Sequence, residues 1–187
     1  ETEGDRFVSN SDTEVILKGY ARWGESIVSE LRGMFAFAIW DSRNQRLFLA
    51  RDPMGIKPLY YFQSDRHFVF ASEVRTLLGT GLVPRQLDEV GLLSYLTFGS
   101  VYDPFTLIKG VLALPPGNSL VWDAGSLKRR QYWDLAEKNS SDGAPPTDQE
   151  IYSLIDESVR MQLVSDVPVG VFLSGGVLNI ATIIGFI

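Results

Sequence analysis

The apolar positions in the first third of the chain change from a helical spacing to a strand-like one. A helix is predicted over residues 13–23 by apolar side chains at helical spacing, Val15, Ile16, Tyr20 and Trp23, with Ser11 or Asp12 as its cap. Residues 34–40 then form a continuous apolar run rich in aromatics, and a second run follows at 46–50. The turn residues between them predict a β-hairpin joined at 41–45.

The middle of the chain continues with short apolar runs separated by turn residues. Residues 51–57 contain Asp-Pro-Met-Gly and predict a turn, and runs at 59–63 and 68–71 predict another strand pair. Four successive strands with short turns indicate an antiparallel sheet, and both of its faces should be covered because the first three strands are apolar almost throughout. The other elements predicted here are helices at 72–78 and 88–98 and a peripheral hairpin at 112–122.

The composition changes near residue 140 and predicts a domain boundary. Residues 138–148 are polar and rich in turn formers, as in an interdomain linker, so we expect one domain at 1–137 and the start of another at 149–187. After the linker, the pattern predicts a helix at 149–163, a buried strand at 167–173, a Ser-Gly-Gly turn and a last apolar segment. This order is typical of the opening of an α/β unit.

Composition and charge limit the classes of function. The chain has 17 Lys and Arg against 23 Asp and Glu, a formal net charge of −6, which gives no electrostatic reason for binding nucleic acid or an anionic membrane. No stretch approaches the roughly 18 apolar residues of a membrane span, and no signal peptide is recognisable. We therefore expect a soluble, cytoplasmic protein with no nucleic-acid or membrane partner.

The chain has no cysteine and one histidine, His67. These counts exclude disulfides, thiolate metal sites and a cysteine nucleophile within this polypeptide, together with most zinc arrangements. His67 has no acid or thiol partner nearby in the sequence and is interpreted as a partly exposed structural residue. We expect no metal site from these residues.

Three segments could carry chemistry, and each also has a structural interpretation. Ser174, Gly175 and Gly176 follow a buried strand, where backbone N–H groups could hold a phosphate, although the glycines could equally make a plain turn. Asp12 could bind a ligand ammonium group or cap a helix. Arg51, Asp52 and Lys57 could line a pocket, but the spacing favours an Arg-Asp pair that locks the turn.

Several segments together resemble a known family, in its order and spacing. They read Ser-Asp-Thr-Glu-Val at 11–15, Gly-Met-Phe-Ala-Phe-Ala-Ile-Trp-Asp at 33–41, Ala-Arg-Asp at 50–52, Gly-Ile-Lys-Pro-Leu-Tyr-Tyr at 55–61, Phe-Ala-Ser-Glu at 70–73, Leu-Pro-Pro-Gly at 114–117 and Val-Pro-Val-Gly-Val-Phe-Leu-Ser-Gly-Gly at 167–176. Taken jointly, they resemble glutamine-hydrolysing asparagine synthetases.

The resemblance implies an α+β fold in two parts. The first is an incomplete N-terminal-nucleophile domain (class II glutamine amidotransferase), a four-layer αββα sandwich with two stacked antiparallel sheets. The second is the start of an α/β ATP-pyrophosphatase domain, like the adenine nucleotide α-hydrolases. In the family, the first domain releases ammonia from glutamine with the thiol of an N-terminal cysteine, and the second adenylates aspartate using ATP and magnesium.

The resemblance also assigns roles to particular residues. Asp12 matches the aspartate that binds the α-amino group of glutamine. Leu173, Ser174, Gly175 and Gly176 match the beginning of the pyrophosphate loop and are the expected ATP-binding residues. The family has an aspartate where this chain has Leu178, which removes a charge from a site that handles magnesium and triphosphate.

We therefore expect a fragment of a glutamine-hydrolysing asparagine synthetase whose small-molecule partners are glutamine, ATP and aspartate. The isolated chain should be inactive, with no catalytic residue of its own and with neither ATP nor magnesium bound. Exposed sheet edges should favour homodimers or self-association. Two alternatives stay open, a non-catalytic glutaminase-like module that binds an amino acid or a partner, and a fragment of a related amidotransferase with another acceptor.

Overall fold

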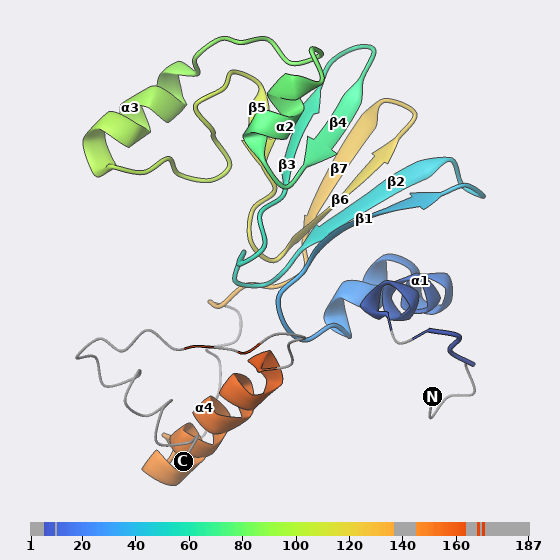
Figure 1. Cartoon of the computed structure of the whole chain (residues 1–187), viewed down its shortest axis with the longest axis vertical. Helices are drawn as coiled ribbons and strands as arrows, with labels where there is room; N and C mark the ends of the chain where they lie inside the picture. Colours follow the sequence, from blue (N-terminus) through green and yellow to red (C-terminus); the bar gives the residue numbers. More distant parts are fainter. Residues whose placement is uncertain (1–5, 10, 137–144, 164–167, 169, 171–187) are drawn as a thin grey trace. The chain divides into compact units, whose positions relative to one another are not determined.

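The computed structural model describes residues 6–9, 11–136, 145–163, 168 and 170. The chain divides into two compact units, Glu1–Asn139 and Ser140–Ile187. In the first unit, two antiparallel sheets are stacked between helices (Figure 1). The order of its elements is α1 (Asp12–Trp23), the 3₁₀ helix η1 (Gly24–Ser29), β1 (Ala36–Asp41), β2 (Arg46–Arg51), β3 (Tyr60–Gln63), β4 (Phe68–Ala71), α2 (Val74–Gly79), α3 (Glu89–Phe98), β5 (Val111–Ala113), β6 (Asn118–Asp123) and β7 (Ser126–Gln131).

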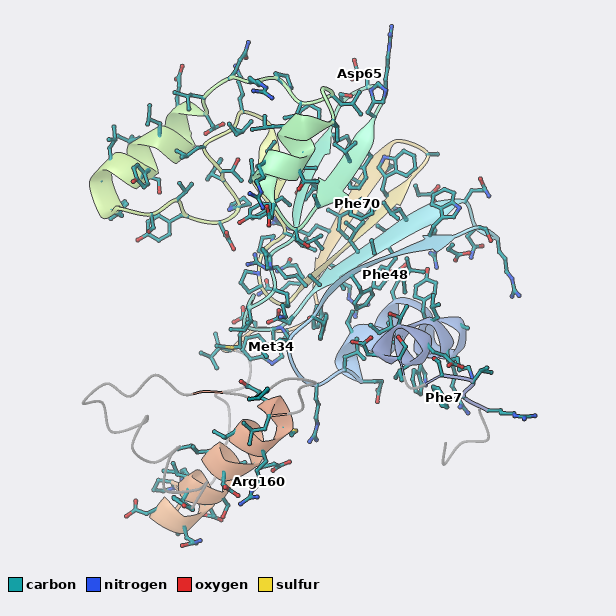
Figure 2. The ribbon with its side chains drawn as sticks, in the orientation of Figure 1. Phe7, Met34, Phe48, Asp65, Phe70 and Arg160 are labelled. Carbon is teal, nitrogen blue, oxygen red and sulfur yellow. The ribbon has the colours of Figure 1, made fainter. Side chains whose placement is uncertain are left out.

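Three layers of apolar side chains hold the four layers of backbone together. Below the first sheet, η1 packs on it through Ile27 and Val28 and α1 through Ile16 and Tyr20. Figure 2 shows Phe48 between this sheet and α1. The ring of Phe48 stacks on Tyr20 at a centroid distance of 5.4 Å. Between the sheets lie Leu49, Leu59, Tyr61, Leu114 and Leu120, and between the second sheet and α2 lie Phe62, Leu77, Val83 and Val111. The αββα order expected from the family resemblance is confirmed.

The prediction of one antiparallel sheet from four successive strands was wrong. The first sheet has the order β1-β2-β6-β7 and the second has the order β4-β3-β5. The two predicted hairpins are correct, with Ile39 opposite Phe48 in one and Tyr61 opposite Phe70 in the other. The turn between β2 and β3 carries the chain from one sheet to the other, which local spacing does not reveal.

The peripheral hairpin predicted at 112–122 was also wrong. β5 pairs with β3 in the second sheet, whereas β6 lies between β2 and β7 in the first. Pro115, Pro116 and Gly117 join the two sheets here, and Gly117 has φ of +64°. The flanking Leu114 and Leu120 are fully buried, so this segment is central. The pattern had predicted no strand at β7, because that strand is largely charged.

The predicted helices of the first unit are present with shifted ends. The helix expected at 72–78 is α2, and the one expected at 88–98 is α3, with Asp88 as its N-cap. Asp88 accepts a hydrogen bond from the backbone N–H of Gly91 at 2.8 Å. His67 is exposed in the loop between β3 and β4, as expected.

The described part of the second unit is mainly one helix, α4 (Asp148–Gln162). Thr147 is its N-cap and forms a capping box with Glu150, in which each side chain accepts a hydrogen bond from the other residue's backbone. This helix was predicted at 149–163 with the same cap. The predicted strand at 167–173, the glycine turn and the apolar segment at 180–187 lie outside the described residues. Within the described ranges, no helix is long and apolar enough to cross a membrane.

Candidate functional site

Asp12 is the first residue of α1, and its carboxylate is available for a ligand. The helix is capped by Ser11, whose hydroxyl accepts a hydrogen bond from the backbone N–H of Thr13 at 3.2 Å. Asp12 is therefore not the cap, contrary to one of the two interpretations of the sequence. Its side chain is exposed and has no hydrogen bond or ion pair with any described residue. A free carboxylate at this position is stabilised by the helix dipole and can attract an ammonium group.

Glu14 fixes the chain that leads into α1. Its carboxylate accepts hydrogen bonds from the backbone N–H groups of Val8 and Ser9 and from the hydroxyl of Ser9, at 2.6 to 3.1 Å. Lys18 forms an ion pair with it at 2.9 Å and also donates to the carbonyl of Arg6. The hydrogen bonds from Ser9 and Lys18, with those from the backbone, lower the pKa of Glu14 from 4.5 to about 2. The carboxylate of Glu14 is therefore engaged in hydrogen bonds within the fold, unlike that of Asp12.

The turn at 51–57 is locked by two side chains that act separately. Asp52 is buried and accepts hydrogen bonds from three backbone N–H groups of the turn, whereas Arg51 donates to the carbonyls of Gly55 and Leu114 at 2.8 and 2.7 Å. Arg51 also forms an ion pair with Asp103 at 3.1 Å. The predicted structural role is confirmed, but no Arg51-Asp52 pair produces it. Arg51 and Asp52 are therefore engaged in holding the fold.

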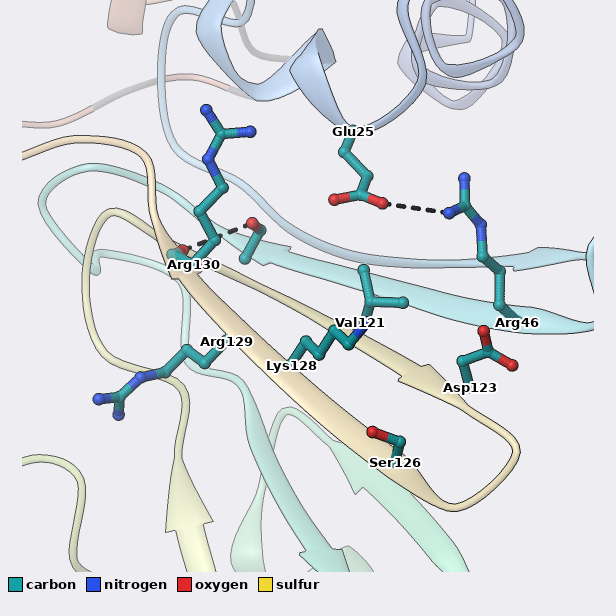
Figure 3. A pocket seen from close by; sticks show the side chains of 9 residues that line it. Glu25, Arg46, Val121, Asp123, Ser126, Lys128, Arg129 and Arg130 are labelled. Carbon is teal, nitrogen blue, oxygen red and sulfur yellow. Dashed lines mark hydrogen bonds and ion pairs between the residues drawn. The ribbon is translucent and has the colours of Figure 1, made fainter.

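A hollow of about 320 Å³ lies on the face of the first sheet that α1 and η1 cover only in part (Figure 3). Arg46 at its edge forms an ion pair with Glu25 at 3.2 Å. Lys128 and Arg130, from β7, line it as well, and their side chains have no polar partner among the described residues. This cationic group was not predicted from the sequence, because no strand was expected at β7. The run Lys-Arg-Arg at 128–130 was the signal, since alternate residues of a strand share a face.

A second hollow of about 410 Å³ lies between α1 and the β1–β2 hairpin. Tyr20 and Asp41 line it, and the two side chains are 3.4 Å apart. Hydrogen bonds from the side chain and backbone of Asn44 lower the pKa of Asp41 to about 2, so this carboxylate, too, is held by its own hairpin. Neither hollow includes Asp12.

The predicted ATP-binding residues Leu173, Ser174, Gly175 and Gly176 lie outside the described residues. Over the part of the chain that it describes, no group of three or more His, Asp or Glu side chains could hold a metal ion. Among the predicted site residues, Asp12 is the one that lies within the described part of the chain.

The amino-acid sequence is similar to known proteins over most of its length. A glutamine amidotransferase domain matches residues 1–133, and an asparagine synthase domain matches residues 150–177. The chain is 37% identical over 174 residues to asparagine synthetase [glutamine-hydrolyzing] 3 of Bacillus subtilis, and this match covers 92% of the chain. The chain belongs to the glutamine-hydrolysing asparagine synthetase family.

Two further matches show the range of proteins that are similar to this family member. It is 36% identical over 177 residues to amidase chry2 of Gibberella zeae. A glutamine phosphoribosylpyrophosphate amidotransferase from B. subtilis matches the structure with a TM-score of 0.47 at 19% identity, over 99% of this chain and 38% of that one. The chain spans 28% of the length of the B. subtilis synthetase and 26% of that of the amidase.

Proposed function

We propose that Asp12 binds the α-ammonium group of glutamine. Glutamine would be the nitrogen donor in an ATP-dependent amidation of aspartate. The observation that carries this proposal is the free carboxylate of Asp12 beside an N-cap supplied by Ser11. Two acidic residues begin α1, and only the function of Glu14 is explained by contacts within the fold. An exposed carboxylate that the fold does not use can pair with an ammonium group, and the resemblance to the family singles out Asp12 among such carboxylates.

The proposal separates binding from catalysis. The family's glutaminase chemistry uses a cysteine thiol, and this chain of 187 residues contains no cysteine. We therefore expect the chain to hydrolyse no glutamine, and to release no pyrophosphate from ATP in the presence of aspartate. Release of ammonia from glutamine by the purified chain would contradict this part of the proposal.

Calorimetric titration of the chain with glutamine tests the role of Asp12. We expect binding in the millimolar range that Asp12→Asn weakens at least about tenfold, corresponding to about 1.4 kcal/mol. Asp148→Asn is the matched control, because Asp148 is likewise the first residue of a helix whose cap is the preceding hydroxyl residue, Thr147. Both variants lose one charge at a helix N-terminus, so an equal effect would assign the change to the helix dipole.

The absence of binding at millimolar glutamine would overturn the proposal and leave Asp12 without a ligand. Binding that both variants retain would also overturn it. Circular dichroism of the two variants would show whether each keeps the helical content of the parent chain, so that loss of the site is not confused with loss of the fold.

The ATP side of the proposal rests on the segment that matches the asparagine synthase domain, residues 150–177. Leu173, Ser174, Gly175 and Gly176 are proposed to begin a pyrophosphate loop, which would supply backbone N–H groups to the phosphates. We expect the isolated chain to bind ATP with magnesium too weakly to detect, because Leu178 stands where the family has an acidic residue. A Leu178→Asp variant that gained ATP affinity would support this assignment, and wild-type affinity in the micromolar range would contradict the expected weakness.

A second candidate function keeps glutamine as the donor and changes the acceptor. The fungal amidase is nearly as similar to this chain as the bacterial synthetases are, at 36% against 37% identity. The acceptor would then be a molecule other than aspartate, while the role of Asp12 stays the same. Aspartate-dependent turnover by a longer protein that contains this chain would decide between the two acceptors.

A further inference from the structure

The strand β7 presents two positive charges on the same face of the first sheet. Successive side chains of a strand point to opposite faces. Leu127 packs between the two sheets, so Lys128 and Arg130 lie on the face toward α1 and η1, and Arg129 lies on the face toward the second sheet. Figure 3 shows the side chain of Arg129 pointing away from Glu25. The two charges are therefore gathered in one hollow, in a chain whose formal net charge is −6.

The two carboxylates that line this hollow lie toward its other end. Glu25 pairs with Arg46 at 3.2 Å, and Asp123 lies opposite Arg46 in the register of β2 and β6. Arg130 lies opposite Ser119. Ser119 is four residues from Asp123, or roughly 13 Å along an extended strand. Within the part of the chain that the structure describes, the charges of β7 therefore have no anion paired with them.

The charge and size of the hollow fit a phosphorylated molecule. A phosphate monoester carries about −1.5 to −2 charges at neutral pH, which matches the combined charge of Lys128 and Arg130. A guanidinium group can donate two parallel hydrogen bonds to phosphate oxygens, and a lysine ammonium group adds a compact charge. The volume of about 320 Å³ is at the lower end of the range of about 300 to 1,000 Å³ for small-molecule sites. A single carboxylate would neutralise only one of the two cations.

We propose that this hollow binds a phosphate group through the side chains of Lys128 and Arg130. Val121 lies opposite Lys128 and lines the hollow between the strands, so it offers an apolar surface to the rest of an organic phosphate. Glu25 faces the same hollow from η1 and opposes the anion by its charge. Asp12 does not line the hollow, so this inference does not depend on glutamine binding.

Calorimetric titration with inorganic phosphate and with ribose 5-phosphate tests the proposal. We expect saturable binding with dissociation constants in the millimolar range or below, weakened by added sodium chloride because salt screens exposed charges. Tighter binding of ribose 5-phosphate would identify a phosphate monoester as the ligand, and equal affinities would identify the free anion. Either result supports a phosphate site, whereas the absence of saturable binding of both probes up to about 20 mM would overturn it.

Arg130→Gln and Arg129→Gln form a matched pair of variants. Each removes one positive charge from an exposed residue of the same strand, but the two side chains lie on opposite faces of the sheet. We expect Arg130→Gln to weaken phosphate binding at least about tenfold and Arg129→Gln to change it by less than about twofold. Equal effects would show that only the total charge of the protein matters, and they would overturn the assigned site.

Glu25→Gln should act in the opposite direction. It removes the negative charge that faces the hollow and releases Arg46 from one of its ion pairs, so we expect phosphate to bind at least about threefold more tightly. Weaker binding by this variant would contradict the proposed arrangement. Urea unfolding of all three variants checks that each is folded, so that a lost site is not confused with a lost fold.

Discussion

The carboxylate of Asp52 accepts a hydrogen bond from the backbone N–H of Lys57 at 2.9 Å, in a position where Asp52 is only 1% exposed. The N–H groups of Met54 and Ile56 donate to the same carboxylate at 3.1 and 3.0 Å. The carbonyl of Asp52 also accepts from Gly117, at 2.9 Å. A single buried residue therefore fixes the crossing from the first sheet to the second at both of the segments that make it.

Replacement of Asp52 by alanine should strongly destabilise the protein. Three N–H groups lose their acceptor, and each one that stays buried and unpaired costs about 1 to 3 kcal/mol. We expect a loss of about 3 kcal/mol or more in the free energy of unfolding, measured by urea titration. Asp65→Ala, in the exposed loop between β3 and β4, is the control and should change stability by less than about 0.5 kcal/mol. Similar losses in both variants would contradict the assigned role.

Substitution of two helical glycines by alanine should have opposite effects. A Cβ atom at Gly91 would clash with the carbonyl of Thr106, and backbone atoms cannot easily move. We expect Gly91→Ala to destabilise the protein by about 1 to 3 kcal/mol through overpacking. Gly79, in α2, has no heavy atom within 4 Å of such a Cβ, so Gly79→Ala should stabilise it by about 0.4 to 1 kcal/mol. Thermal unfolding of the two variants measures both signs, and a stabilising Gly91→Ala would refute the close contact.

The low pKa of Glu14 predicts a loss of stability in acid. Its pKa is about 2 in the folded protein and 4.5 as its ordinary value. Ionisation therefore favours the folded state, with a contribution that is complete above about pH 4.5 and is lost as the pH falls toward 2. We expect Glu14→Gln to lower the urea midpoint at pH 7, and the difference from the parent chain to disappear near pH 2.

Glu30→Gln is the control for the acid series. The side chain of Glu30 is exposed and has no hydrogen bond with a described residue, so its replacement should leave the midpoint unchanged across the same pH range. A Glu14→Gln effect that persisted undiminished to pH 2 would show that the variant acts through packing and not through charge.

The cap of α1 predicts a smaller effect. Ser11→Ala removes the acceptor for the N–H of Thr13 and should reduce the free energy of unfolding by about 1 kcal/mol. Ser126→Ala provides a control, since Ser126 begins β7 and its hydroxyl has no hydrogen bond to a described residue. If Asp12 acted as an alternative cap, Ser11→Ala would have no effect, whereas the double variant with Asp12→Ala would lose the whole contribution.

Local chemistry was sufficient to predict the helices and the two hairpins. Helical spacing and a capping residue locate α1 and α4, because both signals depend on residues within one or two turns of each other. The hairpin between β1 and β2 follows from a turn sequence between two apolar runs. The family resemblance supplied the four layers and singled out Asp12, which helical spacing alone would have treated as a cap.

Tertiary structure decided what depends on contacts between distant segments. The sequence by itself determined where the chain turns and which runs are apolar. It did not determine that β6 would lie beside β2, because this pairing joins residues some 70 positions apart. It also did not reveal the largely charged β7, which pairs with the other edge of β6. The sequence also predicted a helix at 88–98 with Leu93 and Leu96 among its apolar positions, while the structure leaves both side chains exposed. The spacing of apolar residues indicates which side chains tend to be buried. Which segment buries them depends on tertiary packing.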